Sequence, residues 1–385
     1  MNIFGTTFNY EARLKKIRKM MAERDVDCIL IHNWTNQYYI SGMYQHLPWY
    51  PLSHSFITES PLMIFREHDP VFLCALITVN AIKEGTWIKD VRAHDQGFAN
   101  GVHDAIAKVL KEKGLEAGKI GVEEDCCTVS TYQNLQKFLP KAELKHAGDI
   151  FFCVRAVKDP DEIQLIKESV AIGESCLKVA MEVAQPGVSE MEVQRAIEME
   201  MKRLGALREI ETMCQSGIRT ANYRAFAAEW KKIEKDELVT VDLGCLYKGY
   251  GCDMTRTWVV GTPSDEYKRI AQDMYAVYEK FVAFVKPGLR FSEVFNFVRD
   301  ELEKRGYPAT KLSFPNQQFA IHGLGLGPFH DPPGKTHGSM VFEPGMVLSF
   351  QPSARYETFS IRFEDDFVVV PDGLELLTTF PRTLI

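Results

Sequence analysis

The stretch ELVTVDLGCLYKGYGCDMTRTWVVG, residues 237–261, decides the fold of the second half of the chain. Its two apolar runs are joined by a tight turn around Lys248 and Gly249, so it predicts a pair of antiparallel strands. Asp242 and Asp253 lie on either side of this turn, and we expect them to face each other on one side of the hairpin. Their repulsion would be removed by a divalent cation between them, although both carboxylates could instead point to solvent beside basic neighbours.

A second hairpin repeats this geometry further along the chain. The stretch GMVLSFQPSARYETFSIRFEDDFVVV, residues 345–370, predicts two strands about a turn near Glu357 and Thr358. Gln351 and Glu364 are symmetric about that turn, so this hairpin also presents a pair of oxygen ligands.

A glycine-rich stretch lies between the two hairpins. Residues 320–333, AIHGLGLGPFHDPP, carry His322 and His330 among glycines that let the backbone approach a ligand closely. A lone histidine is usually a satisfied polar residue, but the imidazole of His322 would complete an oxygen and nitrogen set suited to Mn, Fe, Co or Zn. The sequence therefore favours a metal site built from three segments.

The second half also contains an internal repeat. Residues 186–206 match residues 287–307 at a constant offset of 101, with Pro, Gly, Glu, Val, Glu and Gly at identical positions. Each copy follows a long helical pattern and ends at a glycine. Amphipathic helices after Pro-Gly turns can look alike by chance, but the repeat favours a duplicated α/β half with the site between the halves.

The first half has a different pattern. Residues 10–150 alternate helical and strand-like segments, with a helix near 10–24, strands at CILIH, VFLCALI and KIGVEED, and a helix at VHDAIAKVLKEKG. Asp159 then suits the N-cap of a long helix. We therefore expect two domains, residues 1–152 and 153–385, the first of α/β class.

The composition limits the classes of protein to which the chain can belong. Its 385 residues are enough for two buried cores, and a net charge of −7 without a clustered basic face argues against a nucleic-acid partner. The first residues interleave acids and bases, and no uncharged run is long enough to span a membrane, so we expect no signal peptide and no membrane partner. The nine cysteines include no C-x-x-C spacing, which favours the cytoplasm.

The motifs taken together resemble those of a known family. The motifs VDLG, CDMTRT, IHGLGLG, FEPGMVLSFQP and IRFED, over roughly residues 150–385, resemble the pita-bread family of methionine aminopeptidases, prolyl peptidases and creatinase. NQYYISGM and VRAVKDPDEI are similar to the prolidase and creatinase branch. The resemblance implies an α/β fold with an N-terminal creatinase-like domain, a C-terminal pita-bread catalytic domain of two related halves, and a homodimer.

The same resemblance implies one or two divalent metal ions per chain. Asp253 and Glu364 would bridge two ions, Asp242 would bind one of them and His322 the other. Gln351 stands where the peptidases have a glutamate that ligates metal and carries a proton, so it would be only a weak, neutral ligand. A creatinase-like mechanism without metal stays an alternative.

Two further sets of residues are candidates for chemistry and substrate binding. The catalytic candidates are His330, Gln351 and Glu364. The substrate-binding candidates are Arg224, Tyr223, His330, Arg362 and Trp49. Arg224 would suit a substrate carboxylate, although a surface arginine is as plausible. Trp49, with Tyr50 and His54, would wall the pocket across a dimer, or form a buried cluster within its own domain.

These features favour one function over three others. We expect a metal-dependent hydrolase that cleaves a C–N bond in a small, carboxylate-bearing substrate. An Xaa-Pro dipeptidase or aminopeptidase is the first alternative, and it is disfavoured because Gln351 cannot carry a proton near neutral pH. A lyase of the kind that cleaves dimethylsulfoniopropionate is the second, and a catalytically inactive binding protein is the least favoured.

Overall fold

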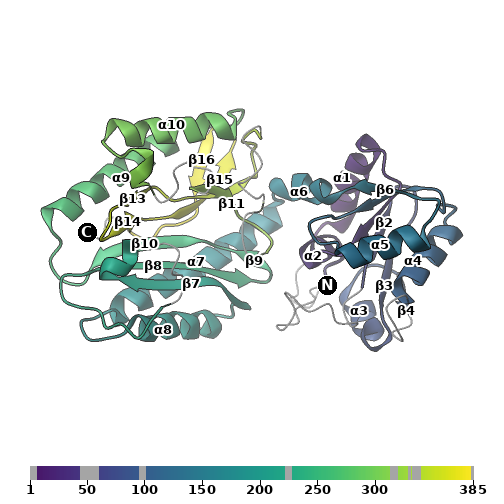
Figure 1. The fold of residues 1–385 in the computed structure, drawn as a ribbon, viewed down its shortest axis with the longest axis horizontal. Helices are drawn as coiled ribbons and strands as arrows, with labels where there is room; N and C mark the ends of the chain where they lie inside the picture. Colours follow the sequence, from purple (N-terminus) through teal and green to yellow (C-terminus); the bar gives the residue numbers. More distant parts are fainter. Residues whose placement is uncertain are drawn as a thin grey trace. The chain divides into compact units, whose positions relative to one another are not determined.

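The structure, a computed structural model, describes residues 7–43, 60–94, 101–221, 228–312, 320–327, 331 and 340–382. The chain forms two compact units, Met1–Val154 and Arg155–Ile385 (Figure 1). Each unit has its own sheets and its own hydrophobic core.

The first unit is an α/β domain around one mixed sheet. Its six strands have the order β4-β3-β2-β1-β5-β6, in which β2 runs antiparallel to β1 and β3 and the other pairs are parallel. The predicted first helix and the strands at CILI, VFLCA and KIGV are all present. The elements are α1 (Tyr10–Glu23), β1 (Cys28–Ile31), α2 (Trp34–Ser41), β2 (Leu62–Phe65), β3 (Val71–Ala75), α3 (Val79–Gly85), β4 (Asp90–His94), α4 (Gly101–Glu112), β5 (Lys119–Val122), α5 (Val129–Phe138), β6 (Glu143–His146) and α6 (Gly148–Ala156).

The second unit places two pairs of helices on opposite sides of its strands, α7 and α8 on one side and α9 and α10 on the other (Figure 1). One sheet has the order β10-β8-β7 with β9 on β8, another has the order β11-β12-β15-β16, and β13 pairs with β14. The elements are α7 (Pro160–Val183), α8 (Glu190–Arg203), β7 (Arg208–Ser216), β8 (Leu238–Tyr247), β9 (Tyr250–Gly251), β10 (Met254–Val259), α9 (Asp265–Phe284), α10 (Phe291–Lys304), β11 (Ile321–Gly323), β12 (Val347–Phe350), β13 (Ser353–Arg355), β14 (Ser360–Arg362), β15 (Asp365–Val370) and β16 (Gly373–Leu376).

The internal repeat is a structural repeat. Helices α8 and α10 begin 101 residues apart, each after a longer helix, as the sequence predicts. The Pro-Gly turns before them share a positive φ, +91° at Gly187 and +94° at Gly288, which glycine adopts without strain. Both glycines also donate to a carbonyl of their own half, Ile233 at 2.8 Å and Phe342 at 2.9 Å. The second unit is therefore built from two related halves.

The predicted register of the first hairpin is wrong by two residues. Asp242 pairs with Thr255, and Tyr247 pairs with Tyr250. The reason is the two-residue loop Lys248–Gly249, in which both residues have positive φ, as a tight hairpin turn requires. Because the hairpin is centred on this loop, Thr255 lies opposite Asp242. Asp253 comes two residues before Thr255 in the chain, so it does not lie opposite Asp242.

The predicted register of the second hairpin is confirmed. Ser353 pairs with Arg362 on one side and Phe350 pairs with Asp365 on the other. Gln351 and Glu364 are the pair between these two ladders, so they face each other where β12 passes into β13 and β14 passes into β15.

An aromatic core holds β12 and β15 against helix α9. The ring of Phe281 stacks on Phe350 at 4.0 Å between centroids and meets Phe367 at 5.4 Å. All three side chains are buried, and burial of each contributes about 1.5–3 kcal/mol. The core thus fixes the strand ends from which Gln351 and Glu364 project.

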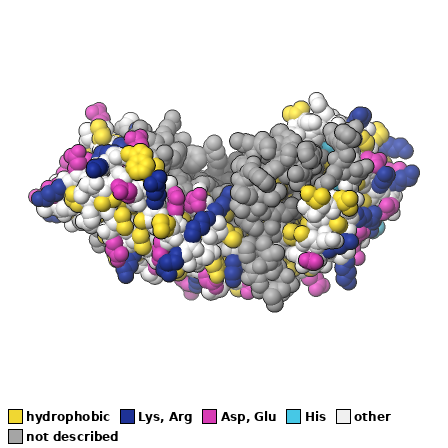
Figure 2. All heavy atoms as spheres, turned by 90° about the horizontal axis from the view of Figure 1, so that it is seen from below, with side chains coloured by type: hydrophobic (Ala, Val, Ile, Leu, Met, Phe, Trp, Pro, Cys, Tyr) yellow, Lys and Arg dark blue, Asp and Glu magenta, His cyan; other side chains and the backbone are white. Residues whose placement is uncertain are grey.

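The described surface mixes charges of both signs. On the face shown in Figure 2, Lys and Arg side chains are interspersed with Asp and Glu. None of the helices in the described part of the chain combines the length and apolar character needed to cross a membrane.

Candidate metal centre

Three predicted ligands meet in the second unit. Asp253 follows β9, His322 lies on β11, and Glu364 lies between β14 and β15. His322 Nε2 lies 3.1 Å from Glu364 Oε1 and 3.7 Å from Asp253 Oδ2. One ligand atom of each residue lies within 4.8 Å of the others, a separation that a single ion can span. The three residues are 7, 2 and 0% exposed, so the carboxylates are screened from water.

The strands of both halves hold Glu364 in place. Its backbone N–H donates to Thr255 O of β10 at 3.0 Å, which links the two sheets at the centre. The Ser349 hydroxyl donates to Oε1 at 2.7 Å, and the Thr255 hydroxyl donates to Oε2 at 3.0 Å. Both oxygens of Glu364 are therefore oriented, as metal-ligating carboxylates usually are.

Charge favours a cation at this cluster. Burial raises the pKa of Glu364, but hydrogen bonds from His322 and Ser349 and the charge of Arg362 outweigh it, so the pKa lies below its usual value. Glu364 is thus an anion close to the Asp253 carboxylate. One imidazole and two buried carboxylates form a donor set that fits a divalent ion of the Mn, Fe, Co or Zn type.

Asp242 and Gln351 have a different partner. The guanidinium of Arg362 forms an ion pair with Asp242 Oδ2 at 2.8 Å and donates to Gln351 Oε1 at 3.1 Å. Burial raises the pKa of Asp242 and the charge of Arg362 opposes this, with a net rise. The structure therefore joins these two predicted ligands through Arg362, beside the cluster of Asp253, His322 and Glu364.

Sequence reasoning missed three residues that support the ligands. Ser349 and Thr255 orient Glu364, and Asp366 accepts from the backbone N–H of Asp253 at 3.0 Å. Each lies two residues from a predicted ligand: Ser349 from Gln351, Thr255 from Asp253, Asp366 from Glu364. Since side chains two apart in a strand share a face, this spacing was the available signal.

Several predicted residues lie outside the described part of the chain. They are Trp49, Tyr50, His54, Tyr223, Arg224 and His330. Asp331, which follows His330, is described and is held close to β11: its backbone N–H donates to Gly323 O at 3.0 Å, and its carboxylate pairs with Arg155 at 3.0 Å.

Two family models together match most of the chain. Residues 164–371, more than half of the chain, match metallopeptidase family M24. Residues 13–157 match the creatinase/prolidase N-terminal domain.

Similar proteins are found over nearly the full length. An uncharacterized peptidase of Bacillus subtilis is 28% identical over 384 residues, covering 97% of this chain and 99% of its own. The Xaa-Pro dipeptidase of Pyrococcus horikoshii is 28% identical over 377 residues, covering 97% and 98%. The structure of an Xaa-Pro dipeptidase from Bacillus anthracis is 27% identical, with a TM-score of 0.85 over 98% of this chain and 99% of that one.

Proposed function

The chain belongs to metallopeptidase family M24, and from this membership we propose that it hydrolyses a C–N bond in a small, carboxylate-bearing substrate. Hydrolysis of C–N bonds and the use of divalent metal follow from the family. The observation that carries the proposal is the buried cluster of Asp253, His322 and Glu364, which offers a metal site inside the family's domain.

We assign the metal to these three residues. A bound divalent ion would polarise the scissile carbonyl and supply a hydroxide near neutral pH. Asp253 and Glu364 provide the negative charge, and His322 provides a neutral nitrogen. Because Asp242 and Gln351 are joined to Arg362, we propose one tightly held ion per chain, of the Mn, Fe, Co or Zn type.

The substrate contacts are proposed from the sequence. Arg224, Tyr223, His330 and Trp49 stay predicted contacts of the substrate, with Arg224 on its carboxylate. Arg362, which was also a candidate, already engages Asp242 and Gln351, so we give it the role of placing those two side chains.

A second candidate is an Xaa-Pro dipeptidase. The relatives named above support it, since such a dipeptide is itself a small molecule with a carboxylate. Gln351 opposes it, because an amide cannot carry a proton between water and the leaving amine. The two candidates differ in what a carboxylate at position 351 would do.

The substitution Gln351→Glu separates the two candidates. If the chain is a weakened dipeptidase, the new carboxylate restores a proton carrier, and cleavage of Xaa-Pro dipeptides should rise about 100-fold or more. If the reaction does not use that carrier, we expect tighter metal binding from the added charge but no gain on Xaa-Pro dipeptides. The measurement is a panel of Xaa-Pro dipeptides assayed beside a metal titration.

Gln351→Met is the matched control, since it removes the oxygen without adding charge. It should lower neither the metal content nor the folding stability by much if Arg362 keeps its bond to Asp242. A large gain for Gln351→Glu on dipeptides would reject the first candidate. An unchanged metal affinity would show that residue 351 does not reach the metal.

We also propose a cytoplasmic homodimer. The nine cysteines are all free thiols in the structure, six of them buried, which suits a reducing compartment. Sedimentation velocity of the purified chain tests the dimer, and a monomer at micromolar concentration would reject it.

A further inference from the structure

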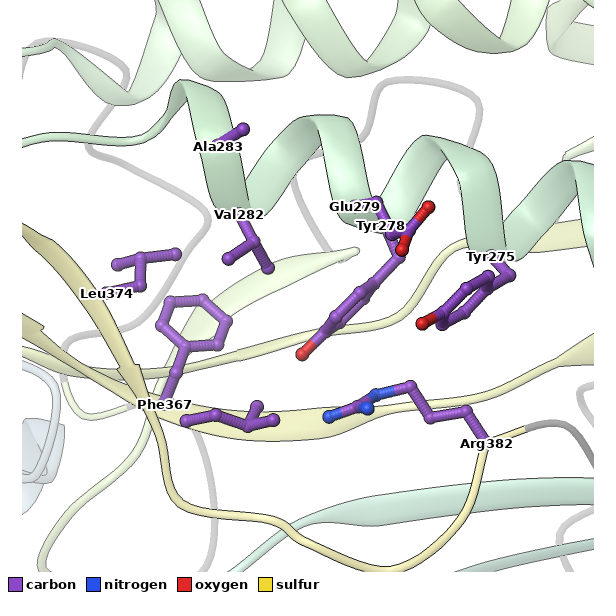
Figure 3. A pocket seen from close by; sticks show the side chains of 9 residues that line it. Tyr275, Tyr278, Glu279, Val282, Ala283, Phe367, Leu374 and Arg382 are labelled. Atoms are coloured by element: carbon purple, nitrogen blue, oxygen red, sulfur yellow. The ribbon is translucent and has the colours of Figure 1, made fainter.

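A pocket separate from the metal cluster lies in the second unit, between helix α9 and the strands β15 and β16. Its volume is about 310 Å³, within the range of pockets that hold small organic ligands. Figure 3 shows it from close by, with apolar side chains toward one end and polar ones toward the other. The apolar end is formed by Val282, Ala283, Phe367, Leu374 and Leu376, and the polar end by Tyr275, Tyr278, Glu279 and Arg382.

The polar end contains two buried groups with spare hydrogen-bonding capacity. Tyr278 is 3% exposed, and its hydroxyl faces the side chains of Asp365 and Arg382 but makes no hydrogen bond of ordinary geometry with a described residue. Nη2 of Arg382 is also buried and makes no hydrogen bond of ordinary geometry with a described residue. The central carbon of this guanidinium lies 4.9 Å from the centre of the Tyr278 ring. A buried donor without an acceptor is costly, so a ligand that supplies an acceptor would be favoured here.

The charges near this end favour an anion. Arg382 pairs with Asp365, but Asp365 also pairs with the buried guanidinium of Arg256 at 2.7 Å. One carboxylate thus faces two guanidinium groups at the inner wall of the pocket, so Asp365 alone does not neutralise both of them. Glu279 also lines this end, but it is exposed, so water screens its repulsion of a single carboxylate, and a dianion would be repelled more strongly.

We propose that this pocket binds a small monocarboxylate with an apolar body. The carboxylate would accept from Arg382 Nη2 and the Tyr278 hydroxyl, and the apolar body would lie against Val282, Phe367 and Leu374 (Figure 3). The proposal concerns binding alone and does not depend on the reaction at the metal centre.

Hexanoate is a suitable probe, titrated by calorimetry into the metal-loaded full chain. We expect saturable binding of hexanoate, with hexanol, hexylamine and the dianion adipate each at least about tenfold weaker, because charged hydrogen bonds dominate recognition. Tyr278→Phe removes only the hydroxyl and should weaken hexanoate binding about five- to tenfold. Arg382→Gln should weaken it more than tenfold, and Val282→Trp should abolish it by filling the pocket.

Two comparisons keep the result unambiguous. Hexanoate could also bind at the metal centre, so Glu364→Gln is tested beside Tyr278→Phe, and it should leave hexanoate binding unchanged. The proposal is overturned if hexanoate fails to bind the wild type, if hexanol binds equally well, or if Glu364→Gln loses binding while Tyr278→Phe and Val282→Trp retain it. A change of oligomeric state in Val282→Trp, without hexanoate binding in the wild type, would instead make the pocket an interface between copies of the chain.

Discussion

Arg362 shows how the partners of one side chain change the interpretation of its neighbours. Sequence motifs place Asp242 and Gln351 among the metal ligands, yet both contact the guanidinium of Arg362. A guanidinium is a permanent cation with donors in a fixed planar fork, so it can balance Asp242 and orient Gln351 together. A fixed protein cation therefore contacts two of the side chains that the family resemblance assigns to metal ions.

The first prediction concerns a pair of neighbouring aspartates. Asp253→Asn removes one of two negative charges from the cluster and should lower metal affinity more than about 100-fold, since even changes to groups that only orient ligands cost about 10–100-fold. Activity should fall with the metal content. Metal analysis after dialysis, beside circular dichroism to check the fold, makes the measurement.

Asp366→Asn is the matched control for that substitution. Asp366 is also a buried aspartate, and it contacts the backbone N–H of Asp253 rather than the space between the ligands. Asparagine keeps an oxygen that can accept this hydrogen bond, so metal affinity should fall much less than in Asp253→Asn. Equal metal loss in both variants would show that ligation by Asp253 is not what holds the ion.

Much of this site could be predicted from residue types and spacing. The sequence motifs placed Asp253, His322 and Glu364 in one predicted ligand set with Asp242 and Gln351, and three of these five residues form the cluster. The contacts of Arg362 could not be predicted in the same way. A strand pattern assigns a side chain to a face of the sheet, but its partner depends on which strand of the other half lies across from it.

At the scale of elements, the turns explain why the register of one hairpin was predicted wrongly and that of the other correctly. The Lys248–Gly249 loop fixes the first hairpin by its positive φ angles, and counting from that loop gives the observed pairing of Asp242 with Thr255. The register predicted from the sequence was wrong because it assumed that Asp242 and Asp253 are equally far from the turn. Counting from the two loop residues would have avoided the error. The second hairpin has a longer connection, and its symmetric ligands gave the correct register.

The repeated helices share a glutamate that ties each to the longer helix before it. Glu200 of α8 accepts from Ser175 of α7 at 2.7 Å. Its equivalent, Glu301 of α10, accepts from Lys280 of α9 at 2.5 Å. Glu301 also bonds to Lys304 at 2.7 Å, and its side chain is 5% exposed, so these are sheltered charge-assisted contacts.

The second prediction follows from the pKa of Glu301. Hydrogen bonds from Lys280 and then Lys304 lower that pKa to about 2. Because the folded pKa lies below the ordinary value of about 4.3, the carboxylate stabilises the fold above pH ~4.3, and this contribution is lost as pH falls toward 2. Glu301→Gln should therefore lower the free energy of unfolding by about 1–3 kcal/mol at pH 7 and by less at pH 3.5.

Urea unfolding followed by circular dichroism at the two pH values makes this measurement. Glu303→Gln is the control, since Glu303 is on the same helix but exposed, and it should change stability by less than about 0.5 kcal/mol. A Glu301→Gln effect that is equally large at both pH values would mean that the packing of the side chain, and not its charge, stabilises the helix pair.

At the scale of the whole molecule, the metal ligands come from both halves of the duplicated unit. Asp253 belongs to the first half, whereas His322 and Glu364 belong to the second. An ion held by all three would resist any opening that separates the halves. The first unit, with its own sheet and core, contributes no residue to the cluster among those described.

The last prediction is that removal of metal destabilises the second unit alone. A ligand present at 100 times its dissociation constant stabilises the bound state by about 2.7 kcal/mol, so a chelator should speed amide hydrogen exchange about 100-fold in β11, β12 and β15. Exchange in β1, β3 and β5 of the first unit should not change. Asp253→Asn should show the faster exchange without chelator and no further effect from it, whereas Asp366→Asn should respond like the wild type. Equal acceleration in both units would mean that the ion stabilises the chain by another route than joining the two halves.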